Sequence, residues 1–513
     1  MTDIPAPHVE YGQLAPIFIV FCVAIVGVAV EAFCPRHLRS RVQVPLALLG
    51  LAGALVATFA LAGTMNVAIE GAIGVDGPTL FLQGTIVALA LLSTLLIAEK
   101  SLDPGGGAFV GQASAVPGSP QEREAMEAGL VQTEVYPLMM FAVTGMLIFP
   151  AANDLLTMFI GLEVLSLPLY LLCGLARRRR LLSQEAAVKY FLLGAFSSAF
   201  FLYGVALVYG YAGSVRLGQI AQAIQAAAGN DIVLLLGVAL LGMGLLFKVG
   251  AVPFHAWKPD VYQGAPTPVT ALMGSCTVVS AFGAALRVFY VAFPGIRWDW
   301  LPLMWGVAII TMVAGVIFAI TQSDVKRMLA YSSIAHTGFI LTGVIATSQE
   351  GLQGTLFYLA AYGFTTIGAF AVVTLVRDPG GEANHLSRWA GLGKRSPLTA
   401  GIFAFFLFAF AGIPLTSGFI GKFAVFAAAV QSGALALVVV GVVTSAIAAF
   451  FYVRVVVLMF FNEPASDGPT VAVPSAFTAT TIAVGVAVTV VLGVVPQPVL
   501  GLAGQAATQM FIR

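Results

Sequence analysis

The chain has 513 residues, of which 59% are hydrophobic and 9% are charged, and its formal net charge is +1. An average soluble domain carries roughly 25% charged residues, so this composition excludes a soluble enzyme or a soluble binding module. The balanced charge, without any long basic run, also gives no indication of a nucleic-acid partner.

The apolar residues are grouped in long blocks, which predict about fourteen transmembrane helices. A helix needs about 20 apolar residues to cross the hydrocarbon layer, and many of the blocks reach that length. In chain order, the predicted helices cover 15–34, 43–63, 80–98, 136–150, 155–175, 187–211, 232–256, 266–293, 301–320, 328–347, 352–376, 397–428, 434–461 and 474–496. We therefore expect an all-α membrane protein surrounded by the lipid bilayer.

Two of these blocks are interrupted by proline and are expected to form broken helices. The seventh is followed by VPFHAWKPDVYQGAPTP, whose prolines prevent a regular helix from continuing. The twelfth is too long for one straight crossing, and Gly412 and Pro414 divide it. Between the third and fourth blocks, residues 99–133 are rich in Gly, Ser and Pro and then acidic, which is typical of a flexible inner loop.

The distribution of Lys and Arg predicts the orientation of the chain. With the N-terminus outside, the inner loops hold sixteen of these residues, whereas the outer loops and tail hold three, which are Arg216, Arg297 and Arg513. Such an excess of positive charge marks the inner side of a membrane protein. Both termini are therefore expected on the outer side, and the polar start MTDIPAPHVEYGQLAP does not resemble a cleaved signal peptide.

The cysteines give no sign of a redox centre. Cys22, Cys34, Cys173 and Cys276 lie far apart, in or beside apolar segments, and form no CxxC pair. Iron–sulfur and zinc frameworks usually contain such pairs. We therefore expect no cofactor and no metal on this chain and place any redox centre on another polypeptide.

Two segments echo each other and predict an internal repeat. KYFLLGAFSS (189–198) and FYLAAYGFTT (357–366) share an aromatic residue, a small residue with Phe and a hydroxyl pair at equal spacing, 168 residues apart. Units of five helices, roughly 155–293 and 328–461, would be inverted relative to each other, because five is odd. Inverted repeats with broken helices are typical of ion-coupled transporters. The alternative is a chance similarity between apolar helices.

Three charged residues fall deep inside predicted helices: Glu163, Lys248 and Lys422. A charge at the bilayer centre costs at least about 2.5–3.5 kcal/mol on insertion scales, so it normally has a function. The first interpretation is a proton relay, in which a Lys in low dielectric exchanges its proton as a nearby carboxylate moves. The alternative is a static ion pair that holds helices together. Lys189 lies near the inner end of its helix, where it either joins the relay or extends its amine to the interface.

Four further residues are candidates for the same pathway. His336 can pass protons near physiological pH, although a hydrogen-bonded packing histidine is the alternative. His255 lies at the end of a broken helix, and Glu31 ends the first predicted helix. Arg454, within FFYVRVVVLMFF, is expected to form a structural pair, because a guanidinium does not readily release its proton.

Five motifs carry a family resemblance along residues 130–455. In order they are GLEVLSLPLY, EAAVKYFLLGAFSSAFFLYG, FKVGAVPFHAWKPDVYQGAPTPV, DVKRMLAYSSIAHTGF and FAGIPLTSGFIGKF. Together they resemble the antiporter-like membrane subunits of respiratory complex I, and most closely the subunit N family of bacterial NADH:quinone oxidoreductase. That family is similar to mitochondrial subunit 2 and to subunits of sodium/proton antiporters.

The resemblance implies a fold of fourteen helices with two inverted five-helix repeats, each with a broken helix. It divides the chain into 1–130, with three spans and most of the inner loop, the repeats 131–293 and 294–461, and a last span in 462–513. By motif, Glu163 matches the fifth-helix glutamate, Lys248 and Lys422 match the lysines of the two broken helices, and His336 matches the tenth-helix histidine.

The implied function is proton translocation across the bacterial plasma membrane, driven by quinone reduction elsewhere in the complex. The implied partners are other membrane subunits, with FMN, iron–sulfur clusters and quinone carried by other polypeptides. One departure stands out: the family usually carries a lysine or histidine in the eighth helix, where this chain has Val278. Either water held by Ser275, Thr277 and Ser280 bridges from Lys248 toward His336, or the pathway takes another route.

Two other functions remain open at this stage. A subunit of a multi-component sodium/proton antiporter would show similar motifs, and a static membrane scaffold would use its buried charges only for pairing. The chain lacks the long sequence after the last span that L-type relatives use for a lateral helix, which argues against that type.

Overall fold

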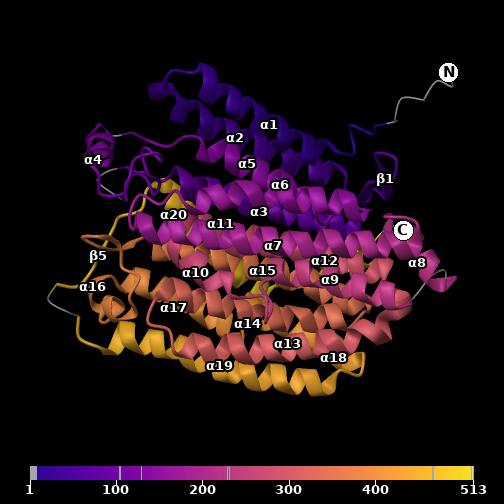
Figure 1. Cartoon of the computed structure of the whole chain (residues 1–513). Helices are drawn as coiled ribbons and strands as arrows, with labels where there is room; N and C mark the ends of the chain where they lie inside the picture. Colours follow the sequence, from indigo (N-terminus) through magenta and orange to yellow (C-terminus); the bar gives the residue numbers. More distant parts are fainter. Residues whose placement is uncertain are drawn as a thin grey trace.

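A computed structural model of the chain describes residues 9–102, 106–128, 130–227, 229, 231–464, 467–509 and 511. The described residues form a bundle of long helices that run nearly side by side (Figure 1). The helices α1 (Ala15–Phe33) and α2 (Arg36–Ala60) lie at one edge of the bundle and α19 (Leu435–Phe461) at the opposite edge. The predicted all-α membrane class is confirmed.

Among the described residues, twelve helices are long and apolar enough to cross a membrane. Besides α1, α2 and α19, they are α3 (Gly77–Ala98), α6 (Leu155–Cys173), α7 (Arg180–Ala212), α9 (Asp231–Val249), the continuous run Thr267–Ala292, the run Pro294–Ile320 that contains α13 (Arg297–Ile320), α14 (Val325–Ile345), α15 (Gln349–Val373) and α20 (Ala476–Val494). Three shorter apolar helices, α5 (Val135–Ile148), α17 (Pro397–Ala411) and α18 (Ser417–Gln431), cover the two remaining predicted segments.

The remaining described helices and strands are short. The short helices are α4 (Pro120–Glu127), α8 (Leu217–Gln225), α10 (Trp257–Gly264), α16 (Leu392–Arg395) and α21 (Gln497–Thr508). The strands β1 (Asn66–Ala68) and β2 (Ile73–Val75) pair antiparallel, with Asn66 opposite Val75. The strand β3 (Val376–Asp378) lies between β4 (Gly381–Glu382) and β5 (Thr470–Val471), antiparallel to both.

Several boundaries differ from the sequence-based expectation: α2 begins at Arg36 rather than near 43, and α9 ends at Val249 rather than near 256. The helix α4 forms inside residues 99–133, which were expected to be a flexible loop, because PQEREAME begins with proline and continues with strong helix formers. Residues 103–105 and 129 of that loop lie outside the described residues. The helix α7 begins at Arg180 rather than near 187, because hydropathy marks the hydrocarbon layer and a helix can extend beyond it into polar surroundings.

Side-chain caps begin several of the long helices at a defined residue. Asp76 accepts a hydrogen bond from the backbone of Thr79 at the start of α3, and Asp154 does the same for α6. Asp324 caps α14 and Ser348 caps α15. Each cap satisfies amide groups that the first helical turn leaves without a partner.

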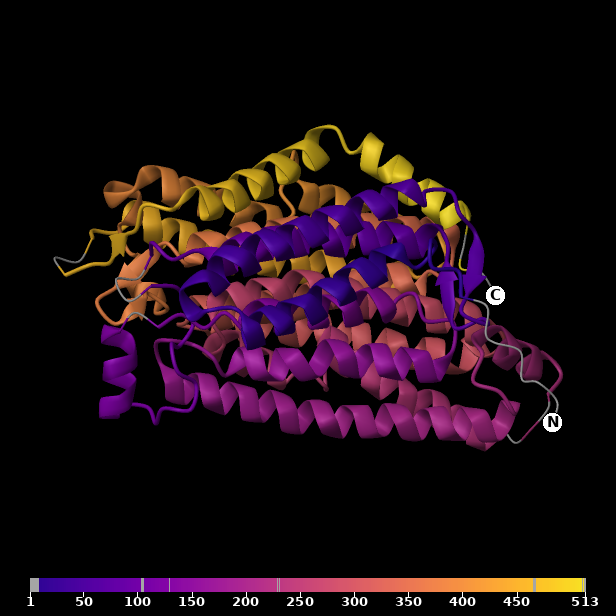
Figure 2. The same ribbon diagram turned by 90° about the horizontal axis from the view of Figure 1, so that it is seen from above.

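The two ends of the bundle differ in charge. Seen from above in Figure 2, α4 lies at one end, whereas the first described residues before α1 and the end of α21 lie at the other. The end with α4 gathers the basic loops, including Arg36, Arg39, Lys100, Arg177, Arg178, Arg179, Lys326 and Arg377. At the opposite end, Arg216 donates to the carbonyl of Glu70 beside the β1–β2 turn (2.7 Å). The chain termini themselves, 1–8 and 512–513, lie outside the described residues.

Both predicted helix breaks are present, and they share one backbone arrangement. The helix α9 ends at Val249, and Gly250 follows with φ of 80° and donates to the carbonyls of Leu246 and Phe247. The helix α17 ends at Ala411, and Gly412 (φ 82°) donates to Phe408 and Ala409 in the same way. A left-handed glycine that turns the chain back on the last helical carbonyls is a common way to end a helix.

The central helices are buried beneath the outer helices of the bundle. In the apolar stretch of each helix, 94% of the residues are buried in α14 and in α15. The share is 100% in the run Thr267–Ala292 and 22% in α1. The sequence-predicted His336 lies on one of these central helices. Polar groups there have no lipid or bulk water to face, so their partners must lie inside the protein.

Candidate functional site

Lys248 lies in the last turn of α9, just before the first break, and is 3% exposed. Its Nζ donates to the hydroxyl of Ser166 on α6 (2.7 Å) and to that of Tyr190 on α7 (3.3 Å). The ammonium also lies 5.4 Å from the centroid of the Tyr190 ring, which stacks on Trp257. Two hydroxyls and an aromatic face therefore hold this buried cation.

Glu163 is half-buried on α6, one turn before Ser166. Its charge acts on Lys248, yet within the described ranges no ion pair within 4.0 Å joins the two side chains. The Oε1 atom of Glu163 is buried and has no hydrogen-bond partner among the described residues. The predicted pairing of Glu163 with Lys248 is therefore electrostatic rather than a direct contact.

His336 lies at the centre of the bundle on α14, is 2% exposed and is surrounded by tyrosines. Its Nδ1 is 2.8 Å from the hydroxyl of Tyr358, and its Nε2 is 3.5 Å from that of Tyr452. The Tyr362 ring lies 4.9 Å from the imidazole, and the Tyr452 hydroxyl also contacts that of Ser332. The imidazole is thus connected to hydroxyls on both ring nitrogens.

Lys422 lies on α18, beyond the second break, and is 5% exposed. Its Nζ donates to the carbonyls of Phe410 (3.0 Å) and Ala411 (2.9 Å) at the end of α17 and to the hydroxyl of Ser445 (2.8 Å). The ammonium also lies 4.8 Å from the centroid of Phe339, whose edge packs on His336. Because both residues contact this ring, the structure brings Lys422 and His336 close together.

Lys189 lies in different surroundings from the other lysines. Its side chain is 43% exposed and forms ion pairs with Glu185 (2.7 Å) and Asp260 (2.8 Å). Asp260 also pairs with Arg327 (2.6 Å). Since exposed ion pairs of this kind contribute little, the arrangement favours an interfacial amine over a buried relay group.

The three secondary candidates have different surroundings. Glu31 accepts hydrogen bonds from Arg39, Gln43 and Thr133, which join the first helices at the basic end. His255 is half-buried in the first break, and its Nδ1 has no hydrogen bond of good geometry to any described residue. Arg454 is exposed on the surface of α19 and donates to the carbonyl of Ile320, so it does not form the buried pair expected from its apolar neighbours.

The segment near Val278 is buried and has an irregular backbone. A π-helix, Met273–Thr277, precedes Val278, which is 3% exposed. Ser275 donates to the carbonyl of Ala271 and Ser280 to that of Met146, whereas the Thr277 hydroxyl has no partner among the described residues. Of the three hydroxyls expected to bind water, only that of Thr277 is therefore unused by the described residues.

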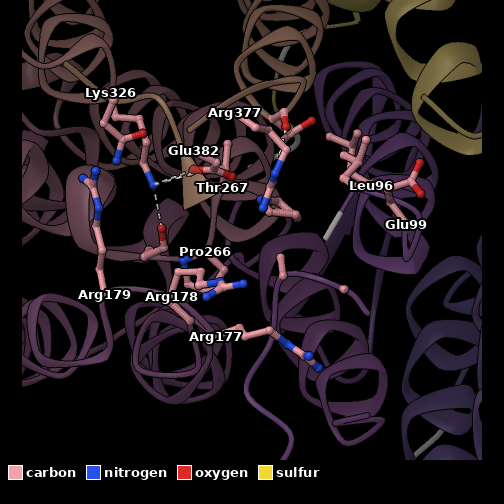
Figure 3. A pocket seen from close by; sticks show the side chains of 18 of the residues that line it. Leu96, Glu99, Arg177, Arg178, Arg179, Pro266, Thr267, Lys326, Arg377 and Glu382 are labelled. Atoms are coloured by element: carbon pink, nitrogen blue, oxygen red, sulfur yellow. Dashed lines mark hydrogen bonds and ion pairs between the residues drawn. The ribbon is translucent and has the colours of Figure 1, made fainter. Parts of the chain in front are cut away.

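A pocket opens at the basic end, beside the starts of α11 (Thr267–Leu272) and α14 (Figure 3). At its base, Lys326 donates to the carbonyl of Ala265 (2.8 Å) and to the Thr267 hydroxyl (3.1 Å) and lies 3.9 Å from Glu382. The volume of the pocket that water-sized molecules can enter is about 70 Å³. It is lined by Arg177, Arg178, Arg179, Arg377 and Glu99.

Glu99, just after α3, binds the start of α20 from this end. Its carboxylate accepts hydrogen bonds from Ser475, Thr478 and Ser101. Burial raises the pKa of Glu99, but these hydrogen bonds outweigh burial and lower the pKa to about 2. The contact joins the N-terminal helices to the C-terminal ones.

Several buried cations were not singled out by the sequence analysis, and two of them lie deep in the bundle. Lys258 is 1% exposed at the start of α10. Arg287 is 0% exposed and pairs with Asp76 (2.7 Å). A signal for Lys258 was available, because it lies between Trp257 and Pro259 in an apolar context. In the part of the chain that is described, no three His, Cys, Asp or Glu side chains gather as metal ligands would.

Comparison with known proteins relates this arrangement to one superfamily. The profile of the family described as NADH:quinone oxidoreductase/Mrp antiporter, TM matches residues 152–448. NADH-quinone oxidoreductase subunit N of Rhodococcus opacus is 65% identical over 523 residues, covering 98% of this chain and 97% of that protein. Subunit N of Mycobacterium tuberculosis is 58% identical over 526 residues, covering 98% and 99%.

Solved structures show the same fold. A chain of respiratory complex I from Thermus thermophilus matches with a TM-score of 0.77 and 32% identity, over 95% of this chain and 99% of that one. A chain of the Mrp complex from Dietzia sp. matches with a TM-score of 0.79 over 97% of both chains, but at 22% identity. At this identity the likeness to the Mrp chain concerns the fold alone. The complex I chain has a similar TM-score but a higher sequence identity.

Proposed function

The chain belongs to the family of NADH-quinone oxidoreductase subunit N, an antiporter-like membrane subunit of complex I, and we propose that it carries protons across the membrane through buried basic residues. The proposed pathway contains Lys248, His336 and Lys422, with Glu163 as the carboxylate that acts on Lys248. Lys189 lies near the inner end of its helix, where its ion pairs with Glu185 and Asp260 give it an interfacial role at the entrance of this pathway.

The observation that carries the proposal is how the buried cations are held. Lys248 and Lys422 contact hydroxyls, carbonyls and aromatic faces. No described carboxylate lies within ion-pair distance of either ammonium. A static scaffold would pair each buried charge directly, because an unpaired buried ion costs several kcal/mol. Neutral partners leave each amine free to gain or lose its proton, as a relay requires.

The helix breaks support the same proposal. Each break exposes backbone carbonyls in the middle of the bundle, and irregular backbone at membrane depth is tolerated only inside protein or beside water. The shared caps at Gly250 and Gly412 support two inverted five-helix repeats within 131–293 and 294–461. In this proposal the chain has fourteen spans, with α5 and the α17–α18 pair completing the twelve longer ones.

The setting is a multi-subunit enzyme. We place the chain in the bacterial plasma membrane, with the basic end of the bundle inside and both termini outside. Other membrane subunits of complex I are its partners, and FMN, iron–sulfur clusters and quinone belong to other polypeptides. This chain performs no redox chemistry itself and uses the energy of quinone reduction through coupled shifts of charge.

The test compares Lys248→Met and Lys422→Met with a matched control in the whole complex, in inverted membrane vesicles. We expect the initial rate of NADH-driven proton uptake to fall by roughly ten-fold or more, because loss of a proton-transferring group typically costs at least this much. The control is Lys394→Met, since Lys394 is exposed and, among the described residues, pairs with the exposed Glu463. Subunit content on native gels monitors assembly. Normal proton uptake by both assembled variants would refute the proposal and favour a scaffold.

A further inference from the structure

Lys258 is a fully buried cation that the pathway described above does not use. It lies in the first turn of α10 and is 1% exposed. Its Nζ donates to the carbonyl of Val249 (3.2 Å) and lies 5.8 Å from the centroid of the Tyr262 ring. Among the described residues, no carboxylate forms an ion pair with it. Lys258 therefore has the same kind of neutral surroundings as Lys248 and Lys422.

The position of Lys258 at the first break matches that of Lys422 at the second. Each lysine follows a break and reaches back to the last carbonyls of the preceding half-helix. Each also packs on the left-handed glycine of the break: a Cβ on Gly250 would lie 2.8 Å from Lys258 Cδ, and one on Gly412 would lie 3.0 Å from Lys422 Cδ. The partial negative charge at a helix C-terminus stabilises both ammonium groups. By this geometry, the counterpart of Lys422 is Lys258 rather than Lys248.

Lys258 lies between the two halves of the proposed pathway. On one side, the carbonyl that it binds belongs to Val249, the residue after Lys248. On the other side, the same carbonyl accepts a hydrogen bond from the Thr337 hydroxyl (3.0 Å), next to His336. The charges of Lys258 and Lys422 both act on His336. Lys258 therefore connects the neighbourhood of Lys248 with that of His336.

Buried hydroxyls that lack a well-formed hydrogen bond lie near Lys258. Among the described residues, the hydroxyls of Tyr262, Ser333 and Thr366 are buried and lack a hydrogen bond of good geometry, although Ser333 and Thr366 approach neighbouring tyrosine hydroxyls. Ser333 lies beside Tyr262 and Tyr362, and a Cβ on Gly274 would lie 3.5 Å from the Tyr262 hydroxyl and 3.1 Å from Thr366 Cγ2. Buried hydroxyls are normally satisfied by protein or by ordered water. This cluster is therefore a place where water can link α10, α14 and α15.

We propose that Lys258 is the proton carrier between Lys248 and His336, in place of the ionisable side chain that the eighth helix lacks at Val278. This inference rests on the proposed function of the chain as a proton pathway. A proton leaves Lys248 Nζ and binds the neutral Lys258 amine, and Lys258 then protonates a ring nitrogen of His336 through the hydroxyl cluster. Each transfer breaks one N–H bond and forms one, so a single positive charge moves along the row.

The decisive variants separate a proton carrier from a structural cation. Lys258→Gln keeps a donor for the Val249 carbonyl but has no proton to release. Lys258→Arg keeps the charge and the donor, but a guanidinium does not readily lose its proton. Lys258→Gln combined with Val278→Lys restores an amine in the same region from the eighth helix. The whole complex in inverted vesicles is assayed for NADH-driven proton uptake, NADH oxidation and subunit content, beside Lys248→Met and Lys422→Met.

We expect proton uptake to fall by roughly ten-fold in both single Lys258 variants, because each removes a proton-transferring group. The double variant should regain at least half of the lost uptake. Wild-type uptake in Lys258→Arg or Lys258→Gln, with Lys248→Met impaired, would overturn this inference and leave the proposed function intact. Loss of assembly in both single variants, without rescue by Val278→Lys, would assign Lys258 a structural role. Wild-type uptake in both Lys248→Met and Lys422→Met would instead refute the proposed function.

Discussion

The buried ion pair between Arg287 and Asp76 provides the sharpest test of how the bundle is held together. Both side chains are 0% exposed, and Nη2 of Arg287 lies 2.7 Å from Oδ2 of Asp76 and 2.5 Å from the Thr79 hydroxyl. Nε of Arg287 donates to the carbonyl of Pro150 (2.8 Å), and the guanidinium lies 4.6 Å from the Phe511 ring. One arginine therefore joins the start of α3 to the ends of α5 and α12 (Val278–Arg287).

The perturbation is Arg287→Met, Asp76→Asn and the double variant. Removing one partner of a buried pair leaves an uncompensated charge and costs about 3–5 kcal/mol. For a chain of this length, that corresponds to a fall in melting temperature of about 3–5 °C. Asn at position 76 keeps a side-chain oxygen that can cap α3. The double variant removes both charged groups, so it leaves no unpaired charge in the interior. The fall in melting temperature of the double variant should therefore be at least about 2 °C smaller than the sum of the falls in the two single variants.

The assay is thermal dissociation of the purified complex, followed on native gels by retention of this subunit. Arg297→Met is the matched control, because Arg297 is exposed and packs on Trp298, and it should shift the transition by less than about 1 °C. Shifts in the two single variants that simply add in the double variant would refute the reasoning. So would single variants as stable as the control.

Two further predictions concern stability and helix packing. Glu99→Gln should destabilise the subunit by roughly 1–2 kcal/mol, because it weakens charge-assisted hydrogen bonds to the start of α20. Since the pKa of Glu99 is about 2 in the folded protein and ordinarily 4.5, this stabilisation is fully present above pH 4.5 and is lost as the pH falls toward 2. Melting curves of both proteins across that interval should converge, and a constant difference would contradict the assignment. Gly418→Ala should destabilise by about 1–3 kcal/mol or more, since its Cβ would lie 1.9 Å from the Ala409 carbonyl oxygen across the second break. Gly401→Ala, which meets nothing within 4 Å, is the control and should be neutral or slightly stabilising; equal melting of the two variants would show that the break is not tightly packed.

The sequence by itself determined the membrane class, the positions of the helices and the family. Long apolar blocks can only be spanning helices, because lipid offers no partner for backbone amides. Proline and glycine in the sequence indicated both helix breaks, because proline has no backbone N–H and glycine readily adopts positive φ. Lys248, Lys422 and His336 were recognisable because each is a charged or titratable group inside an apolar block.

The tertiary structure decided what those side chains contact. Glu163 and Lys248 are spaced along different helices, so only packing could show that they interact through charge without touching. Lys258 looked like a loop residue, because prolines around it end the regular helix, yet the chain folds back and buries it beside the first break. Arg454 is the converse case, since an apolar neighbourhood in sequence does not say which face of a helix points outward. Hydropathy measures average surroundings along the chain, whereas the protonation path depends on contacts between helices far apart in sequence.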